Sequence, residues 1–518
     1  MEREQDCVIA FLSDPATHGA DVSAVQRIDT HISIIFLAGD RVFKLKRAVV
    51  LEFLDYGTPD KRRFYCEREL VLNRRTAPAM YLGVRAINRD TAGRLTIDGP
   101  GDAIDWVVEM MRFDADSLFG RQADVGQLTL DRVRQAADEI TALHEIAEIV
   151  TDDRDGDEAG MSPTVAQLRG GLGGHADIFG MAAVTDYLNR ITAVEQDQRE
   201  LLSARFRAGW VRVCHGDLHL NNICMFDGRP TLFDAAEAND RFMRIDVLYD
   251  LAFLLMDLEM RGLRAQANAV LNRYAACCEA PRAALAGLRA MPLFLSLRAA
   301  IRAEVSVLTA DNVAAVDARD HLGVARRYFD LARKVLVPVP AALVAVGGAS
   351  GTGKTCLARA IAPDLGPAPG AVIVRSDEVR KSLFGVAYTD RLPETAYTEE
   401  WHRRTYTEVI ARAQHALAAG HACIVDAVHG SPGERAGIEE VAAAADVPFH
   451  GVWLEAPADV LRARTAGRMG DASDAGPEVA MNQLRRGFGD VAWPSVDATG
   501  DIDAVSVRVR DILGTRMR

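Results

Sequence analysis

The chain has 518 residues, with 60 Lys and Arg against 73 Asp and Glu, which gives a formal net charge of −13 at pH 7. Because a single hydrophobic core rarely grows past about 250–300 residues, this length predicts at least two domains. Hydrophobic residues make up 49% of the chain and charged residues 26%, an ordinary globular composition that argues against global disorder. The acidic balance argues against a dedicated nucleic-acid-binding protein, which usually carries a basic field.

Targeting and membrane signals are not expected in this sequence. It shows no run of about 18 apolar residues. The N-terminal region, with Glu2, Glu4 and Asp6, lacks the basic segment followed by apolar residues that marks a secretory signal. The cysteines are scattered without a CxxC pair, which favours reduced thiols over a disulfide framework or a zinc site. These features together predict a cytoplasmic protein.

The first half begins with segments that are typical of strands. Residues 32–37 and 41–45 flank a predicted tight turn, which indicates a β-hairpin. A charged, helix-prone segment follows at 61–75, and residues 106–111 are typical of a strand again. From Leu130 onward, apolar residues recur at near-helical spacing. The pattern predicts a strand-rich N-terminal lobe followed by a helix-rich lobe.

A loop with the chemistry of phosphoryl transfer follows a short apolar strand at 211–214. The loop, residues 215–222, reads HGDLHLNN and carries Asp217 and Asn222 five positions apart. A carboxylate there can accept a hydroxyl proton, while the amide oxygen five residues on can hold a metal ion. A second predicted strand ends at Asp234, another carboxylate suited to Mg²⁺. Asp and Asn are common in turns, so the third residue gives the pattern its weight.

On these residues the first half resembles the aminoglycoside phosphotransferase and choline-kinase branch of the protein-kinase-like fold. The run IDVLYDLAFL at 245–254 is the second mark of this resemblance. The resemblance implies that Asp217 is the general base and that Asn222 and Asp234 are metal ligands. It also implies that Asp250 braces the catalytic loop.

The same resemblance implies an ATP-phosphate lysine on the third strand and a glutamate partner on the next helix. The N-terminal lobe offers Lys44 and Lys46, which lie on one face of the same predicted strand. Lys44 is the expected residue and Lys46 the alternative. The expected helix partner is Glu67, with Glu69 as the alternative. A solubilising edge strand is the other interpretation of the two lysines.

Three departures separate this half from protein kinases. Gly216 stands where protein kinases place the arginine that binds a phosphorylated activation loop. Asp234 is followed by two alanines, and residues 29–33 replace the glycine-rich loop that covers the nucleotide. These departures favour a small-molecule substrate over a phosphorylation-switched protein kinase, and they leave a weak or lost activity open.

The boundary between the two predicted domains lies near residue 338. Two prolines in the stretch VLVPVP at 335–340 oppose a helix and favour an extended linker. The apolar run that follows it precedes a glycine cluster and a helical pattern, as at the start of an α/β domain. The expected domains are therefore residues 1–337 and 341–518.

Residues 348–355, GASGTGKT, match the phosphate-binding pattern GxxxxGK[ST] at every fixed position. Glycines allow backbone N–H groups to surround a phosphate, and the following helix N-terminus favours negative charge. Lys354 is expected to neutralise the β- and γ-phosphates, and Thr355 to hold Mg²⁺. The predicted nucleotide-binding residues are Gly348, Ser350, Gly351, Thr352, Gly353, Lys354 and Thr355.

Two further predicted strands of this half, at 372–374 and 424–425, lead into carboxylates. Asp377 follows the first strand and Asp426 ends the second. Because ligands of an open parallel sheet bind just past the strand C-termini, both carboxylates are expected to converge with Lys354.

With these residues the segment 341–518 resembles P-loop kinases of the polynucleotide-kinase, gluconate-kinase and zeta-toxin type. The resemblance implies that Asp377 accepts the substrate hydroxyl proton and that Arg380 holds the substrate or its phosphate. A helix N-cap is the other interpretation of Asp377. Asp426 is implied to orient Mg²⁺ through water.

The run LRARTAGR at 461–468 completes this resemblance. Arg464 and Arg468 are four residues apart on one predicted helix face, and the resemblance implies that they clamp the transferring phosphoryl group. A solvated helix face is the other interpretation of these arginines.

Taken together, the chain resembles the bacterial family of bifunctional aminoglycoside phosphotransferase/ATP-binding proteins. The expected fold is an α+β protein-kinase-like (aminoglycoside phosphotransferase) domain followed by an α/β P-loop kinase domain with a parallel sheet. The implied function is an ATP- and Mg²⁺-dependent kinase with two active sites that phosphorylate hydroxyls of small polar metabolites.

Two alternatives to this two-site kinase remain open. In the first, the chain is a nucleotide-sensing regulator with a pseudokinase half and a slow ATPase half. In the second, it is a polynucleotide-end kinase through its second half. The intact Asp217, Asn222 and Asp234 argue against the first, and the acidic charge argues against the second. The expected partner is a small-molecule substrate, without a membrane and without nucleic acid, and the pattern leaves the oligomeric state open.

Overall fold

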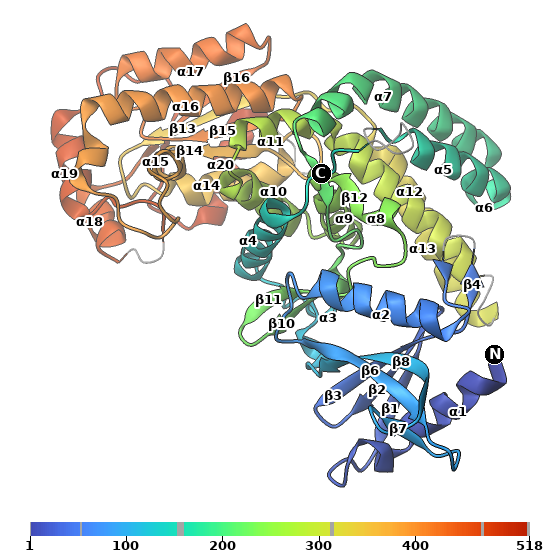
Figure 1. The fold of residues 1–518 in the computed structure, drawn as a ribbon. Helices are drawn as coiled ribbons and strands as arrows, with labels where there is room; N and C mark the ends of the chain where they lie inside the picture. Colours follow the sequence, from blue (N-terminus) through green and yellow to red (C-terminus); the bar gives the residue numbers. More distant parts are fainter. Residues whose placement is uncertain (1, 52–53, 153–159, 311–314, 468–470, 515–518) are drawn as a thin grey trace. The chain divides into compact units, whose positions relative to one another are not determined.

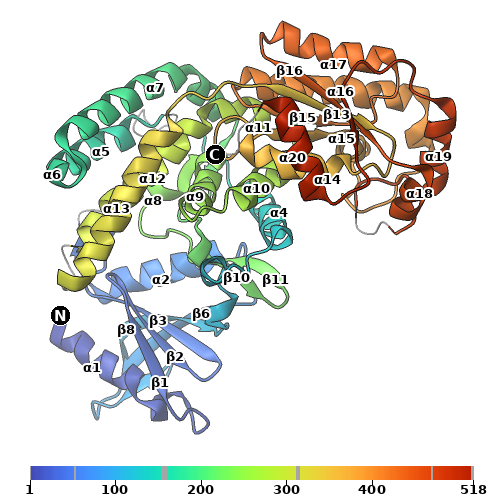
Figure 2. The same ribbon diagram turned by 180° about the vertical axis from the view of Figure 1, so that it is seen from behind.

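A computed structural model describes residues 2–51, 54–152, 160–310, 315–467 and 471–514 of the chain (Figure 1; Figure 2 shows the opposite side). The chain forms two compact units. The first comprises Met1–Arg154 and Phe206–Leu254, and the second comprises Asp155–Arg205 and Leu255–Arg518. These units follow the packing of the chain, and the expected domain boundary near residue 338 stays a prediction.

The first unit is built on an antiparallel six-stranded sheet with the order β1-β2-β3-β8-β6-β7. Gly39 and Asp40 join β2 to β3, which confirms the predicted hairpin. Gly39 has a φ of 61°, a conformation that glycine adopts at little cost. The strands are β1 (Val25–Asp29), β2 (Ser33–Ala38), β3 (Arg41–Lys46), β6 (Tyr81–Arg89), β7 (Leu95–Ile97) and β8 (Asp102–Met111), with the short pair β4 (Val50–Leu51) and β5 (Leu54–Asp55) beside them.

Helix α2 (Pro59–Asn73) packs against strands β6 and β8 of this sheet. Thr58 begins the helix, because its side chain accepts a hydrogen bond from the backbone N–H of Lys61. The buried guanidinium of Arg62 donates to both carboxylate oxygens of Asp105 on β8, at 2.7 and 3.0 Å. This bidentate pair fixes which face of α2 lies on the sheet.

The rest of the first unit surrounds the segment 214–222 with short strands and helices. The helix predicted to begin near Leu130 is confirmed as α4, whose N-cap is Thr129. Two antiparallel strand pairs, β9 with β12 and β10 with β11, flank the segment. The elements are α1 (Glu2–Ser13), α3 (Phe119–Asp124), α4 (Leu130–Ile146), β9 (Val211–Val213), β10 (Ile223–Phe226), β11 (Arg229–Leu232), α8 (Asp240–Met243), β12 (Arg244–Asp246) and the start of α9 (Val247–Met260).

The second unit opens with helices, of which α12 and α13 pack side by side along their length. The stretch Pro281–Ala310 is long and apolar enough to cross a membrane, with a mean hydropathy of 1.4, although 78% of that window is buried inside the protein. Core packing therefore accounts for an apolar stretch that the sequence analysis did not single out. The helices are α5 (Ser162–Gly174), α6 (Ala176–Phe179), α7 (Met181–Arg207), α10 (Arg264–Cys277), α11 (Pro281–Gly287), α12 (Met291–Ala310) and α13 (Ala315–Val335).

The same unit contains a five-stranded sheet with the order β14-β15-β13-β16-β17, in which every pairing is parallel. This confirms the predicted α/β domain with a parallel sheet. The strands are β13 (Leu343–Gly348), β14 (Val372–Arg375), β15 (Cys423–Asp426), β16 (Phe449–Glu455) and β17 (Ser495–Asp497). The helices are α14 (Lys354–Ile361), α15 (Ser376–Phe384), α16 (Glu399–Ala418), α17 (Pro432–Ala444), α18 (Ala458–Ala466), α19 (Pro477–Arg486) and α20 (Ile502–Leu513).

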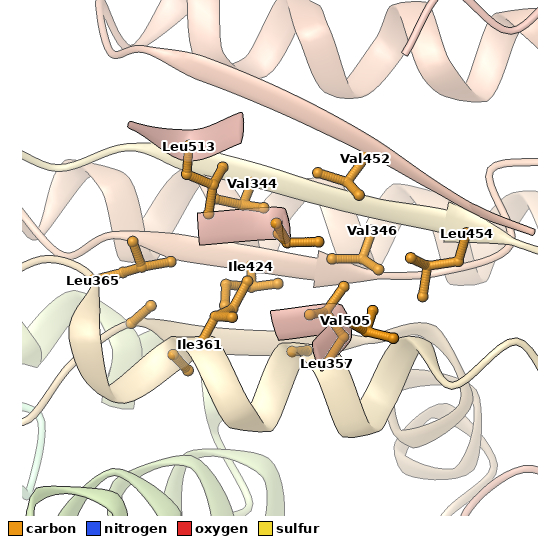
Figure 3. Packing of buried hydrophobic residues seen from close by; sticks show 14 of the residues in the cluster. Val344, Val346, Leu357, Ile361, Leu365, Ile424, Val452, Leu454, Val505 and Leu513 are labelled. Carbon is orange, nitrogen blue, oxygen red and sulfur yellow. The ribbon is translucent and has the colours of Figure 1, made fainter. Parts of the chain in front are cut away.

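The main core of this sheet lies between its central strands and the helices α14 and α20 (Figure 3). Val344 and Val346 of β13 pack with Leu357 of α14 and Val505 of α20, and all four side chains are buried. Helices α16 and α17 cover the opposite face of the sheet (Figure 1). This packing holds β13 and α14 rigidly on both sides of the predicted phosphate loop.

Helix α10 covers the free edge of β14. The side-chain oxygen of Asn272 accepts a hydrogen bond from the backbone N–H of Ile373, at 2.6 Å. The side-chain nitrogens of Asn268 and Asn272 donate to the carbonyl oxygen of Ala371, at 3.0 and 3.1 Å. Two amides therefore occupy backbone groups that an uncovered edge strand would leave unpaired.

We predict that Asn272→Ala lowers the free energy of unfolding by about 1–3 kcal/mol, because it leaves the Ile373 N–H without its partner at a covered edge. Urea unfolding of the full chain measures the loss. The matched control is Asn189→Ala, the same change at an exposed position of α7. Equal stability of the two variants would show that the Asn272 amide does not support the edge of β14.

Candidate active sites

The predicted catalytic loop of the first unit runs from β9 to β10. The side-chain nitrogen of Asn222 donates to the carboxylate of Asp217 at 3.0 Å and to its carbonyl oxygen at 2.9 Å. The same nitrogen lies 3.4 Å from the carbonyl oxygen of Asp234, which follows β11. The Asp217 carboxylate is 41% exposed, so it can meet a molecule from solvent. The structure thus brings together the three residues singled out from the sequence, while their roles stay predictions.

Backbone hydrogen bonds to one buried carboxylate hold the loop in place. Asp250, in the first turn of α9, accepts from the N–H of His215 at 3.0 Å and from the N–H of Gly216 at 2.9 Å. The ring of His144 lies 3.1 Å from the same carboxylate. His144, Cys214 and Asp250 lie close enough to hold a metal ion, but these backbone donors already occupy both oxygens of Asp250. The geometry therefore fits the expected bracing role of Asp250.

Gly216 cannot be replaced by a larger residue without moving the loop. Its φ is 83°, and a Cβ there would lie 2.6 Å from the carbonyl oxygen of Phe242. The backbone at this position therefore does not accept a side chain such as an arginine.

A buried network of lysines and carboxylates adjoins the loop. The ammonium of Lys44 on β3 lies 2.9 Å from Glu69 of α2 and 2.5 Å from Asp234. Lys46 lies 2.7 Å from the other oxygen of Glu69 and also pairs with Glu237. Glu69 therefore bridges two lysines that are both buried.

The network keeps its charges despite burial. Burial disfavours the charged form of Lys44, but Asp234, Glu69 and Glu237 outweigh it and raise its pKa well above the usual value. Burial would likewise raise the pKa of Glu237, yet Lys46 and Lys44 lower it to about 2. Tyr56 supports the same carboxylate, to which its hydroxyl donates at 2.8 Å.

The expected helix partner of Lys44 was Glu67, and this is wrong. Glu67 lies on the exposed side of α2, where it pairs with Arg63 at 2.8 Å. Glu69, the alternative, faces the sheet and takes the role. Glu237 and Tyr56 could not be identified from the sequence, because no motif surrounds them.

The second candidate site surrounds the phosphate loop between β13 and α14. Gly348, Gly351 and Gly353 have φ values of 136°, 91° and 90°, which only glycine adopts without strain. The ammonium of Lys354 donates to the carbonyl oxygens of Gly348 and Ala349 at 2.9 and 3.0 Å. The loop therefore has the backbone shape that the sequence pattern predicts.

A hydroxyl and a carboxylate meet at the end of this loop. Thr355 donates its hydroxyl hydrogen to Asp426 at 2.6 Å, which joins the first turn of α14 to the end of β15. The two residues predicted to serve Mg²⁺ are thus neighbours, and hydroxyl and carboxylate oxygens suit that ion.

Arg375, at the end of β14, was missed from the sequence. Its buried guanidinium lies 3.4 Å from Asp426 and 2.5 Å from Asp471, and it donates to the hydroxyl of Tyr388 at 3.0 Å. Burial would lower its pKa, but Asp426, Glu378 and Asp471 raise the pKa well above the usual value. The sequence signal for Arg375 is its position directly before the carboxylates in the first turn of α15.

Asp377 and Arg380 lie on the first turns of α15. Asp377 is inside the helix, so the N-cap interpretation is wrong; Arg375 occupies the cap position without a side-chain cap bond. Arg380 is buried, donates to the carbonyl oxygen of Ala396 at 2.8 Å and lies over the ring of Tyr397. Their roles toward a substrate stay predictions.

Arg464 makes contacts that the sequence did not indicate. Its guanidinium donates to the carbonyl oxygens of Ala498 and Thr499 at 2.8 and 3.3 Å, which anchors α18 to the turn after β17. These bonds use two of its five N–H donors, and its role as a phosphoryl clamp stays a prediction. Arg468, its predicted partner, lies outside the described residues.

A cavity of about 660 Å³ opens beside the phosphate loop. Ala349 and Thr352 of the loop form one wall, and Trp453, Pro457 and Phe488 contribute apolar surface. Mostly apolar walls with a few polar groups are typical of pockets that bind small molecules.

Comparison with known proteins gives two matches to family models. Residues 93–290 match the model of the phosphotransferase enzyme family, and residues 343–489 match that of an AAA domain. Uncharacterized protein Rv2004c of Mycobacterium tuberculosis (strain ATCC 25618 / H37Rv) is 29% identical over 461 residues, which cover 87% of this chain and 88% of that protein. Uncharacterized protein Mb2027c of Mycobacterium bovis matches with the same identity and coverage.

Among solved structures, a choline/ethanolamine kinase family protein from Mesorhizobium loti is 14% identical and has a TM-score of 0.37. The match covers 64% of this chain and 99% of that chain. A sugar kinase from Janibacter sp. is 19% identical over 34% of this chain and 95% of that chain, with a TM-score of 0.27. The two family models therefore match a phosphotransferase-family domain in the first part of the chain and an AAA domain in the second part.

Proposed function

We propose that the protein is an ATP- and Mg²⁺-dependent kinase with two active sites, each of which transfers the γ-phosphoryl group of ATP to a hydroxyl of a small polar metabolite. The observation that carries this proposal is the convergence of Asp217, Asn222 and Asp234 with the Lys44–Glu69 pair. This set holds a base, metal ligands and a phosphate-binding cation within one cluster, as phosphoryl transfer requires.

The donor set of the first site fits a magnesium ion. Asp234 has a carboxylate that is 41% exposed. Asn222 uses its side-chain nitrogen for Asp217, which leaves the amide oxygen as the group for a metal. When bound, Mg²⁺–ATP would supply the γ-phosphoryl group, and the ion would neutralise part of the phosphate charge. Lys44, held by Glu69, would bind phosphate oxygens, and Asp217 would accept the proton of the attacking hydroxyl.

The second site offers a parallel arrangement on an unrelated fold. Lys354 now rests on the carbonyl oxygens of its own loop, and a bound triphosphate would offer it stronger, charged acceptors. Thr355 and Asp426 are the residues that would hold Mg²⁺, and the cavity beside Ala349 and Thr352 would take the nucleoside.

Three further observations support parts of this proposal: the compartment, the acceptor class and the activity of the first half. All eight cysteines are free thiols, which supports a reducing compartment such as the cytoplasm. The net charge of −13 supports a small-molecule acceptor over a polynucleotide end. The complete set of Lys44, Glu69, Asp217, Asn222 and Asp234 supports an active kinase over a pseudokinase scaffold.

We predict that Asp217→Asn removes the kinase activity of the first site and that Lys354→Met removes the kinase activity of the second. Asp217→Asn keeps the shape of the side chain and removes the base, and should lower turnover of the first site by about 10²–10⁴-fold. Lys354→Met removes the phosphate-binding cation of the second site. Mg²⁺-dependent ADP formation by the full chain, supplied with a mixture of hydroxylated metabolites, measures both. A double variant that keeps the wild-type rate would refute the proposed function.

We predict that Lys46→Met destabilises the first unit by about 3–5 kcal/mol, because it leaves Glu69 and Glu237 as buried carboxylates with one cation between them. Urea unfolding measures the loss. The matched control, Lys61→Met, removes an exposed lysine that pairs with Asp55, and should leave stability unchanged within error. Equal stability of the two variants would contradict the role assigned to Lys46.

A further inference from the structure

A second cavity, of about 730 Å³, lies between the first halves of α16 and α17. The apolar side chains of Val409 and Ile438 line it and are buried, and polar groups form its rim. No motif of the sequence points to this cavity, and the roles proposed above do not use it.

The cavity adjoins the phosphate loop. His429 lines it and lies three residues beyond Asp426, on the loop that follows β15. Val428 of that loop accepts a hydrogen bond from the N–H of Gly348, at 3.2 Å. Asp426 itself binds Thr355. One wall of the cavity is therefore continuous with the residues proposed to hold Mg²⁺ and phosphate.

His429 is a buried polar side chain whose ring is poorly paired. Only 1% of the residue is exposed. The carbonyl oxygen of Val425 lies near the ring, but neither ring nitrogen makes a hydrogen bond of ordinary geometry among the described residues. Its φ of 50° adds backbone strain. Burial lowers its pKa to about 4, so at neutral pH the ring offers one donor and one acceptor. Buried unpaired groups and strained backbone cluster at binding sites, where a ligand supplies what is missing.

The charged side chains around the cavity favour ligands of a particular charge. Glu399, Glu400 and Glu434 lie among its lining residues together with Arg403. Arg404, the next residue of α16, pairs with Glu400 at 3.6 Å, so three carboxylates face two guanidinium groups. His402 is held by Glu434 at 2.7 Å. Such a rim repels anions and favours neutral or positively charged molecules.

We propose that this cavity binds the acceptor of the P-loop half, and that the acceptor is a neutral or positively charged polyhydroxylated small molecule. This inference rests on the proposed kinase function of that half. An acceptor hydroxyl oxygen forms a bond to the γ-phosphorus while the bond from that phosphorus to the bridging oxygen of ADP breaks. ADP leaves with the bond electrons, and the hydroxyl proton passes to the carboxylate of Asp377, the predicted base. Burial raises the pKa of the Tyr406 phenol in the cavity lining, and Arg380, on the same helix as Asp377, lies close enough to that phenol to oppose the rise.

The test uses the full chain with Asp217→Asn, which silences the first site, and four probes of similar shape. Glucose is neutral, glucosamine is a cation, and gluconate and glucose 6-phosphate are anions. Saturation-transfer NMR and probe-dependent ADP formation measure binding and turnover. The proposal expects glucose and glucosamine to bind about tenfold or more tightly than the anions. Tighter binding of either anion, or binding of none of the four, would overturn it.

Two variants locate the bound probe. His429→Phe fills the same space without ring nitrogens and should weaken glucosamine binding about tenfold, as expected for lost hydrogen bonds. Thr407→Trp fills the cavity from its exposed rim and should have the same effect without disturbing the core. The matched control is His415→Phe on the same helix, outside the cavity lining, which should bind glucosamine as the parent does.

Lys354→Met distinguishes failure of the proposed kinase function from failure of the cavity assignment. If it leaves ADP formation by the Asp217→Asn chain and the number of ATP molecules bound per chain unchanged, the proposed function of the P-loop half fails. If instead Lys354→Met abolishes ADP formation and lowers bound ATP from two molecules to one per chain, while His429→Phe and Thr407→Trp bind glucosamine normally, the kinase function stands and the assignment of this cavity is wrong.

Discussion

The ion pair between Lys44 and Glu69 is the interaction on which the first half is organised. It joins the central sheet to α2, and through Asp234 it reaches the end of β11. A buried lysine is costly unless carboxylates surround it, and Glu69 and Glu237 meet that requirement for Lys44 and Lys46 together. These ion pairs offset the cost of burying the charges, and they hold Lys44, Asp234 and the loop at 215–222 in fixed relative positions.

The second half holds its charged groups in fixed positions without a comparable cluster of lysines. Its parallel strands end at one edge, so the glycine loop after β13 and Asp426 of β15 meet there as a consequence of topology. Arg375 supplies a buried cation beside Asp426, and Asn272 on α10 completes the edge of the neighbouring strand. The two halves thus bring the proposed metal carboxylates and phosphate-binding cations together by unrelated means. The first half uses buried ion pairs, and the second uses the ends of parallel strands and a glycine loop.

Much of this arrangement could be predicted from local sequence. The hairpin that carries Lys44, the loop from Asp217 to Asn222 and the phosphate loop each depend on neighbouring residues and on glycine or turn chemistry. The choice between Glu67 and Glu69 could not be made, because the buried face of α2 carries Arg62, Cys66, Glu69 and Asn73, and this mostly polar face gives no hydrophobic periodicity. Arg375, Arg464 and Glu237 are positioned by contacts between distant segments, which neither spacing nor motif reveals.

The central claim is that one chain holds two separate triphosphate sites. Equilibrium binding of Mg²⁺ with a non-hydrolysable ATP analogue to the full chain tests this most directly. The account predicts two analogue molecules per wild-type chain and one per chain in each of the single variants Asp234→Asn and Lys354→Met. One molecule per wild-type chain, or two in either variant at saturating analogue, would contradict it.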